Sequence, residues 1–250
     1  MVILISGKQG SGKSNLTTEL KNTFLETRSL KFADPIYSMH DAIWNEIKRP
    51  EGEPYDLPAV YKAAHDAAWG VLAGYGMQPE LLSEDLMDYL TNTFQKTPLS
   101  PREKKSSPLL QFLGTEFGRK RDTDIWVNLA KNKAEQLLKS CQFVAVDDGR
   151  FENEFHAFPE AFKIRLECDR DIRKERCDAW RENEFHPSEV GLDEYSKAGR
   201  FDYYIDTGVR NRDETLGMAV RFITKRMNNF STDQGDYESV VKKFYTLKAG

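Results

Sequence analysis

Short apolar runs alternate with longer amphipathic stretches along this chain. Residues 2–5 form a wholly apolar run of β-branched and aliphatic side chains. Beyond residue 14, apolar side chains recur every four positions, as they do on one face of a helix: Leu16, Leu20 and Phe24. The pattern therefore predicts a buried strand, a short loop and a helix within the first 24 residues.

Three later apolar runs, at residues 142–146, 162–166 and 203–205, predict further strands. The first of them is continuously apolar, as a strand buried on both faces of a parallel sheet should be. Residues 30–33 form one more short apolar stretch. Strand-like runs that alternate with helical patterns are typical of an α/β protein.

Periodic apolar positions predict helices between these runs. Asp34 and Pro35 offer a cap and a first-turn proline for one of them, and Gly114 should stop another. The predicted helices span residues 36–49, 59–73, 79–94, 109–113, 124–138, 153–158, 169–184 and 214–227.

The segment from residue 50 to residue 107 has helical patterns and polar, proline-containing loops at 51–58 and 96–107. We interpret it as a helical insertion between strands of the sheet. His40 lies on the apolar stripe of the preceding predicted helix. Because no other His or Cys is spaced to share a metal with it, we interpret His40 as a packed side chain.

The composition is that of an ordinary globular chain, with 250 residues of which 39% are hydrophobic. The three cysteines form no C-x-x-C pair, which argues against a disulfide framework or a zinc site. No apolar run approaches the ~20 residues that cross a bilayer, and no signal peptide is indicated, so we expect a cytoplasmic protein without a membrane partner. A net charge of −4 with scattered Lys and Arg argues against nucleic-acid binding.

Residues 7–14, with the sequence GKQGSGKS, satisfy the P-loop spacing G-x-x-x-x-G-K-S. Glycines let backbone N–H groups turn inward around phosphate oxygens, Lys13 supplies a positive charge, and the Ser14 hydroxyl can bind Mg²⁺. A glycine-rich turn without function is the alternative. The preceding strand and the following helix favour the P-loop, because the helix N-terminus adds to the anion site.

An acidic pair, Asp147 and Asp148, follows the strand at residues 142–146. A P-loop enzyme keeps the carboxylate that organises Mg²⁺ at the end of such a strand. The alternative is an aspartate that only caps the next helix.

Arginines at positions 170, 173, 176 and 181 lie in one charged segment. They fit a solvated helix with acid–base pairs. They equally fit a lid that stabilises charge on a transferred phosphoryl group.

Several motifs in a shared order resemble the bacteriophage deoxynucleoside monophosphate kinases, members of the P-loop nucleoside monophosphate kinase family. Besides the P-loop, they are FADPI at residues 32–36, QFLGT at 111–115, Asp148-Gly149-Arg150 with Glu154, and HPSEVGL at 186–192. The similarity extends from the P-loop to about residue 208. Two departures are Ser107-Pro108, where the family has basic residues, and Asn15, where threonine is common.

The resemblance implies an enzyme that uses MgATP to phosphorylate deoxynucleoside monophosphates. Its catalytic residues would be Lys13, Asp148, Arg150, Arg173, Arg176 and Arg181. ATP would be bound by Gly7, Gln9, Gly10, Ser11, Gly12, Lys13, Ser14 and Asn15. The acceptor nucleotide would be bound by Asp34, Gln111, Gly114, Thr115, Trp126, Arg150 and Glu154. Ser14 and Asp148 would place Mg²⁺.

The resemblance also implies a parallel five-stranded sheet flanked by helices. A kinase core would comprise residues 1–35, 108–168 and 200–229, with a nucleotide-binding insertion at 36–107, a lid at 169–199 and a tail at 230–250. His186, Ser188 and Glu189 would belong to the lid or its hinge. A homodimer is expected, in the host cytoplasm if the protein is of phage origin.

Three questions stay open at this stage. Trp126 is either a stacking wall for a base or a core tryptophan. The chain could also be another small-molecule or polynucleotide kinase with a P-loop. It could be a nucleotide-binding regulator without catalysis.

Overall fold

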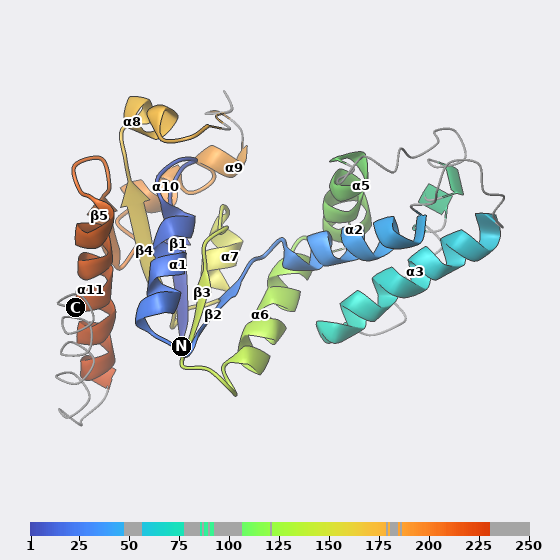
Figure 1. Cartoon of the computed structure of the whole chain (residues 1–250), viewed down its shortest axis with the longest axis horizontal. Helices are drawn as coiled ribbons and strands as arrows, with labels where there is room; N and C mark the ends of the chain where they lie inside the picture. Colours follow the sequence, from blue (N-terminus) through green and yellow to red (C-terminus); the bar gives the residue numbers. More distant parts are fainter. Residues whose placement is uncertain are drawn as a thin grey trace. The chain divides into compact units, whose positions relative to one another are not determined.

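The computed structural model describes residues 1–47, 57–77, 86, 88–89, 91–92, 107–120, 122–178, 180, 185 and 187–230. Contacts within the chain divide it into two compact units (Figure 1). The first unit comprises Met1–Leu30 and Leu137–Gly250, and the second comprises Lys31–Gln136. Most of the predicted helix at 79–94, the two predicted loops of the insertion and the predicted tail lie outside the described residues.

A five-stranded, all-parallel sheet forms the centre of the first unit. Its strands are β1 (Val2–Ser6), β2 (Thr27–Leu30), β3 (Phe143–Val146), β4 (Phe162–Glu167) and β5 (Tyr203–Asp206). The order across the sheet is β2-β3-β1-β4-β5, so β1 lies between β3 and β4. The predicted α/β fold with a five-stranded parallel sheet is confirmed.

Strand β2 lies earlier in the chain than the apolar stretch at residues 30–33. It is an edge strand, and only Thr27 and Leu30 of its four residues are buried. A strand with one covered edge and two exposed side chains has no apolar run by which the sequence could reveal it.

Helices α1 (Lys13–Thr23) and α11 (Arg212–Phe230) pack against the sheet through one apolar core (Figure 1). Leu16 and Leu20 of α1 and Ile223 of α11 are buried members of this core. The other helices of this unit are short: α7 (Glu152–His156), α8 (Arg170–Glu175), α9 (Pro187–Val190) and α10 (Asp193–Lys197).

The prediction of a helix over residues 169–184 is wrong in its length, because α8 ends at Glu175. The side chain of Arg173 is buried and donates to the carbonyl oxygens of Cys168 and Gln9. The interpretation of this segment as a solvated helix therefore does not apply to Arg173.

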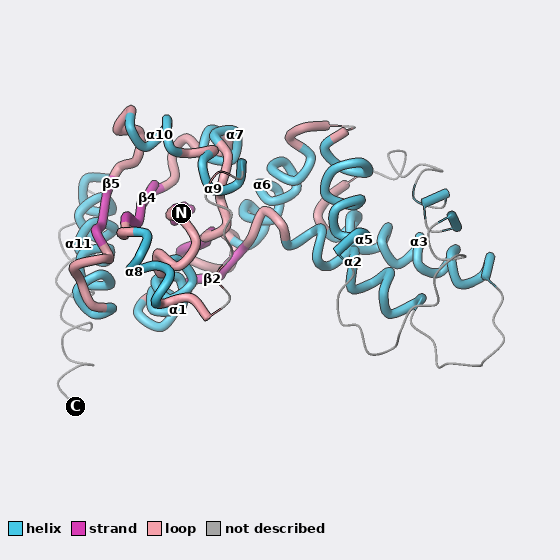
Figure 2. The backbone as a smooth tube through the Cα atoms, turned by 90° about the horizontal axis from the view of Figure 1, so that it is seen from above, coloured by secondary structure: helices cyan, strands magenta, loops and turns pink. Residues whose placement is uncertain are grey.

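The regular elements described for the second unit are helices, and Figure 2 shows the strands gathered in the first unit. The helices are α2 (Asp34–Ile47), α3 (Leu57–Gly74), α5 (Ser107–Gln111), the π-helix η2 (Phe112–Arg119) and α6 (Ile125–Leu137). Their core contains Met39, Ile43 and Trp126. His40 is buried and stacks on Trp44 with ring centroids 5.6 Å apart, so its prediction as a packed side chain is confirmed.

Gly114 does not end a helix, which corrects the sequence prediction. The chain continues from α5 into η2 as far as Arg119. Gly118, four residues further, lies directly beneath the Trp126 indole, and a Cβ atom at Gly118 would overlap that ring. Gly118 thus permits close packing against the Trp126 ring, and the predicted stop at Gly114 does not occur.

Candidate functional site

The P-loop connects β1 to α1 and has the backbone that its glycines predict. Gly10 has φ 79° and Gly12, the N-cap residue of α1, has φ 94°, both in the left-handed region. A Cβ atom at Gly10 would also come within 2.6 Å of the Arg173 carbonyl oxygen. Glycine is therefore required at this position both for the turn and for space.

The side chain of Lys13 folds back over the P-loop. Its Nζ donates to the carbonyl oxygens of Gly7 (2.6 Å) and Lys8 (3.0 Å). Burial, reinforced by the positive charge of Arg150, lowers the pKa of Lys13 to about 8, although Glu189 and Asp147 act in the opposite direction. Lys13 is thus a positive charge held in a partly desolvated site, where its attraction to an anion is less screened.

The carboxyl end of β3 lies beside the P-loop because β1 and β3 are neighbouring parallel strands, with Leu4 paired to Val146. The residues that follow β3 include Asp148 and Arg150. The buried carboxylate of Glu154 accepts hydrogen bonds from the backbone N–H groups of Arg150 (2.5 Å) and Phe151 (3.0 Å). Glu154 thereby fixes the backbone from which Arg150 projects.

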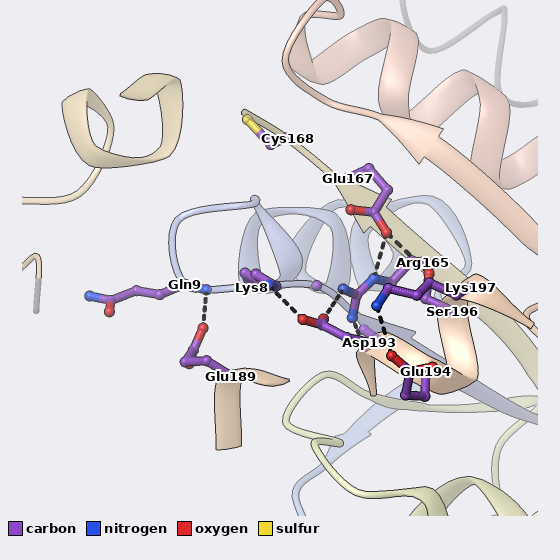
Figure 3. Close-up of polar contacts among 12 residues, drawn as sticks. Lys8, Gln9, Arg165, Glu167, Cys168, Glu189, Asp193, Glu194, Ser196 and Lys197 are labelled. Atoms are coloured by element: carbon purple, nitrogen blue, oxygen red, sulfur yellow. Dashed lines mark hydrogen bonds and ion pairs between the residues drawn. The ribbon is translucent and has the colours of Figure 1, made fainter. Parts of the chain in front are cut away.

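Glu189 on α9 connects Arg150 to the P-loop. One carboxylate oxygen accepts from Arg150 Nη1 (2.6 Å) and the other accepts from the backbone N–H of Gln9 (2.9 Å), a contact drawn in Figure 3. Burial alone would raise the pKa of Glu189, but the Gln9 N–H, Arg150 and Lys13 stabilise the charged form and lower it overall. Sequence reasoning assigned Glu189 to the lid region and missed these contacts.

A second carboxylate, that of Asp193 on α10, contacts the P-loop one residue earlier (Figure 3). Asp193 accepts from Lys8 Nζ at 2.9 Å and lies 3.6 Å from Arg165 Nη2. Arg165, buried in β4, also donates to Ser6 Oγ (3.0 Å) and Glu167 Oε1 (2.9 Å). Arg165 was read from the sequence only as part of a strand, so this polar network was not predicted.

The arginines proposed for the lid have different positions. Arg173 Nη1 donates to the Gln9 carbonyl at 3.0 Å, so Arg173 supports the P-loop. Arg176 Nη1 donates to the Thr207 carbonyl at 2.8 Å. Arg181 lies outside the described residues.

A cavity of about 580 Å³ begins at the P-loop. Its lining comprises residues 10–16, Glu19, Arg176, Cys177, Thr207, residues 210–212, Thr215 and Leu216. Thr207 Oγ1 donates to the Ser11 carbonyl at 3.0 Å and so joins the loop after β5 to the P-loop. Four of the lining residues are basic and one is acidic, and the volume is in the range of small-molecule sites.

The predicted magnesium residues, Ser14 and Asp148, offer oxygen donors of the hard type that Mg²⁺ prefers. Within the described ranges, no group of three or more His, Cys, Asp or Glu side chains could hold a metal. Mg²⁺ is commonly bound by one or two carboxylates together with water and substrate phosphates. A hydroxyl and an acidic pair next to a phosphate loop therefore fit Mg²⁺ that arrives with a nucleotide.

Five predicted acceptor residues belong to the second unit: Asp34, Gln111, Gly114, Thr115 and Trp126. Asp34 begins α2 and accepts from the backbone N–H of Lys31 at 2.7 Å. Trp126 is 2% exposed and its Nε1 donates to the Gly114 carbonyl at 2.9 Å. The indole thus has the core position that the sequence left open, and nucleotide contacts of these five residues stay a prediction.

Comparison with solved structures found chains that are similar to this one in fold. No protein-family model matches this sequence, and no curated protein matches it. Among solved structures, thymidylate kinase from Candida albicans is similar over 91% of this chain and 92% of that chain, with a TM-score of 0.43 and 11% identity.

Within the described helices, none has the length and apolar character needed to cross a membrane. The contacts of the site are the basis for the function proposed next.

Proposed function

We propose that this chain is a nucleotide kinase that transfers the γ-phosphoryl group of MgATP to a deoxynucleoside monophosphate. The observation that carries the proposal is the single carboxylate of Glu189 between the Gln9 N–H and Arg150. Two anion-binding elements, the P-loop and the guanidinium of Arg150 in the segment after β3, both contact the same carboxylate. Donor and acceptor phosphates bound to them would be close enough for direct transfer.

The donor half would consist of the P-loop and its cavity. The triphosphate of ATP would bind the backbone N–H groups at the start of α1, where the helix dipole also favours an anion. The nucleoside would occupy the cavity lined by Asn211 and Thr215. Lys13 would leave the carbonyl oxygens of Gly7 and Lys8 and bind phosphate oxygens instead.

The acceptor half would be centred on Arg150. Its planar guanidinium matches the geometry of a phosphate, and Glu154 holds its backbone in place. The preference for a deoxynucleoside monophosphate is inferred from the motifs at residues 32–36 and 111–115.

Phosphoryl transfer of this kind needs positioning and charge stabilisation and no covalent enzyme intermediate. Bound Mg²⁺ would supply charge neutralisation on the phosphates, with Ser14 and Asp148 to hold it. Lys13, Arg173, Arg176 and Arg181 would neutralise the transferred group, and closure of the segment at 169–199 would exclude water.

A coupled assay of ADP release tests the proposal with each deoxy- and ribonucleoside 5′-monophosphate in turn. Turnover with at least one deoxynucleoside monophosphate is expected. Equal use of an oligonucleotide 5′ end would favour a polynucleotide kinase. ATP binding without turnover on any acceptor would favour a regulator and contradict the proposal. Sedimentation of the same preparation would test the expected homodimer.

A further inference from the structure

Glu189 is a buried acid whose charge is shared among three groups of the site. Its side chain is 5% exposed, and its two oxygens bind Arg150 Nη1 and the Gln9 N–H. Its charge also acts on Lys13, whose pKa it raises against the effects of burial and Arg150. One carboxylate therefore neutralises donors from both halves of the proposed site.

The same donors are those that the proposed function assigns to phosphates. Arg150 would bind the acceptor phosphate, and Lys13 and the P-loop amides would bind the triphosphate. A carboxylate and a phosphate cannot accept the same N–H bonds, and their like charges repel in a poorly solvated site. A guanidinium has five N–H donors, but Glu189 occupies Arg150 Nη1 and the Gln9 N–H, so phosphates should bind more tightly once the carboxylate has left these two donors.

We propose that Glu189 is an internal anion that the two substrates displace, and that this exchange couples their binding. The inference rests on the proposed function and identifies a positioning residue for it. Because Glu189 spans both halves, a phosphate on Arg150 removes one of the bonds that keep the carboxylate on the P-loop. The first substrate to bind thus supplies the free energy that displaces Glu189. The second substrate then binds more tightly, because the carboxylate has already left its donors.

Neighbouring acids make different contacts, which provides matched controls. The carboxylate of Glu194 on α10 is exposed and accepts from Lys197 Nζ at 2.7 Å. Glu194→Gln removes the same charge as Glu189→Gln from a helix close by in the chain. Glu189→Asp keeps the charge on a side chain that is shorter by one methylene and cannot maintain both bonds without movement.

Isothermal titration with β,γ-imido-ATP and Mg²⁺ tests the displacement. Relative to the unmodified chain, Glu189→Gln should bind the analogue more tightly, by about 5- to 150-fold, the usual range for coupling between two groups. Glu189→Asp should show a smaller gain and Glu194→Gln none. Circular dichroism melting of each variant verifies the fold.

The possible outcomes separate the inference from the proposed function. Equal or weaker binding by Glu189→Gln would show that Glu189 only supports the P-loop, and would overturn the inference while leaving the kinase proposal intact. If Glu189→Gln does not fold, the absence of any gain in Glu189→Asp would overturn the inference in the same way. Failure of every protein, the unmodified chain included, to bind the analogue would contradict the proposed function and the inference with it.

Coupling is tested by repeating the titration with a mixture of the four deoxynucleoside 5′-monophosphates present. The mixture should tighten binding of β,γ-imido-ATP to the unmodified chain and to Glu194→Gln. It should have little effect on Glu189→Gln, in which no internal carboxylate needs to be displaced. Equal tightening in Glu189→Gln would overturn the coupling role.

Discussion

Each of the two units has an apolar core, but the first unit also contains the charged contacts of the candidate site. In the first unit, the site is built from charged side chains that bind backbone atoms or one another, as Arg173 and Glu189 do. In the second unit, the described helices pack through an apolar core in which Trp126 lies against Gly118. We therefore expect that removing a charge from the candidate site in the first unit mainly changes nucleotide binding and kcat. Changing the volume of a core side chain in the second unit should mainly change the free energy of unfolding.

The largest effect is expected from removal of the charges in the first unit. Lys13→Ala and Arg150→Ala should each lower kcat at least about 100-fold, the scale found when one stabilising donor is removed from a catalytic site. Arg150→Ala should also raise the KM of the acceptor more than that of ATP. Steady-state kinetics measure both, and an Arg150→Ala variant with unchanged kcat and acceptor KM would show that Arg150 has been misassigned.

The matching change in the second unit is Gly118→Ala. The added methyl group would overlap the Trp126 indole and should lower the free energy of unfolding by about 1–3 kcal/mol, as overpacking commonly does. Thermal melting measures this loss. Gly70→Ala in α3 is the control, because a Cβ there meets nothing within 4 Å and alanine favours a helix interior. Equal melting of Gly118→Ala and Gly70→Ala would refute tight packing at Gly118.

A smaller loss is expected from Trp126→Phe. The variant keeps an aromatic ring in the core but removes the donor to the Gly114 carbonyl, and the loss of this hydrogen bond should cost about 0.5–1.5 kcal/mol. Denaturant unfolding measures the change. β,γ-imido-ATP affinity should stay the same, and a large loss of it would contradict the assignment of Trp126 to the core of the second unit.

The pH dependence of ATP binding should show the mildest effect. The pKa of Lys13 is lowered to about 8 in the folded chain, below its ordinary value of 10.5. The unfolded chain therefore holds this proton more tightly, so Lys13 opposes folding fully below pH 8 and its penalty is relieved as pH rises from 8 toward 10.5. The affinity for ATP should instead fall as the pH rises, because the phosphates are attracted to the protonated amine of Lys13.

Titration with β,γ-imido-ATP between pH 7 and pH 9.5 tests this trend. Affinity should fall gradually above pH 8 in the unmodified chain. Lys13→Arg should lose the fall, since its guanidinium stays charged over this range. The same fall in Lys13→Arg would assign the titration to another group.

The sequence predicted the elements whose signal is local. The strands at residues 2–5 and 142–146 were found because buried parallel strands are continuously apolar, and the P-loop because its glycine spacing is required by its backbone. The sequence pattern did not locate β2 at Thr27–Leu30, because this edge strand has no continuous apolar run. The stop at Gly114 was wrongly predicted because glycine ends many helices, whereas here the chain continues from α5 through Gly114 into η2.

The contacts that organise the candidate site could not be predicted in the same way. Glu189 and Gln9 are separated by 180 residues, and Lys8 and Asp193 by 185. No periodic pattern links positions so far apart, and acidic residues on short helices are common on any surface. The HPSEVGL motif at residues 186–192 was the signal available for Glu189. It assigned Glu189 to the lid or its hinge but did not indicate which residues Glu189 contacts.

The position of β1 in the middle of the sheet has a consequence for how the chain folds. β1 is synthesised first, yet both of its neighbours, β3 and β4, begin only after residue 142. Pairing must therefore close long loops before any ladder bond is gained, which is typical of slow folding with high contact order. During translation the apolar segment Val2–Ser6 would wait unpaired for more than half of the chain, so refolding yield should depend on protein concentration.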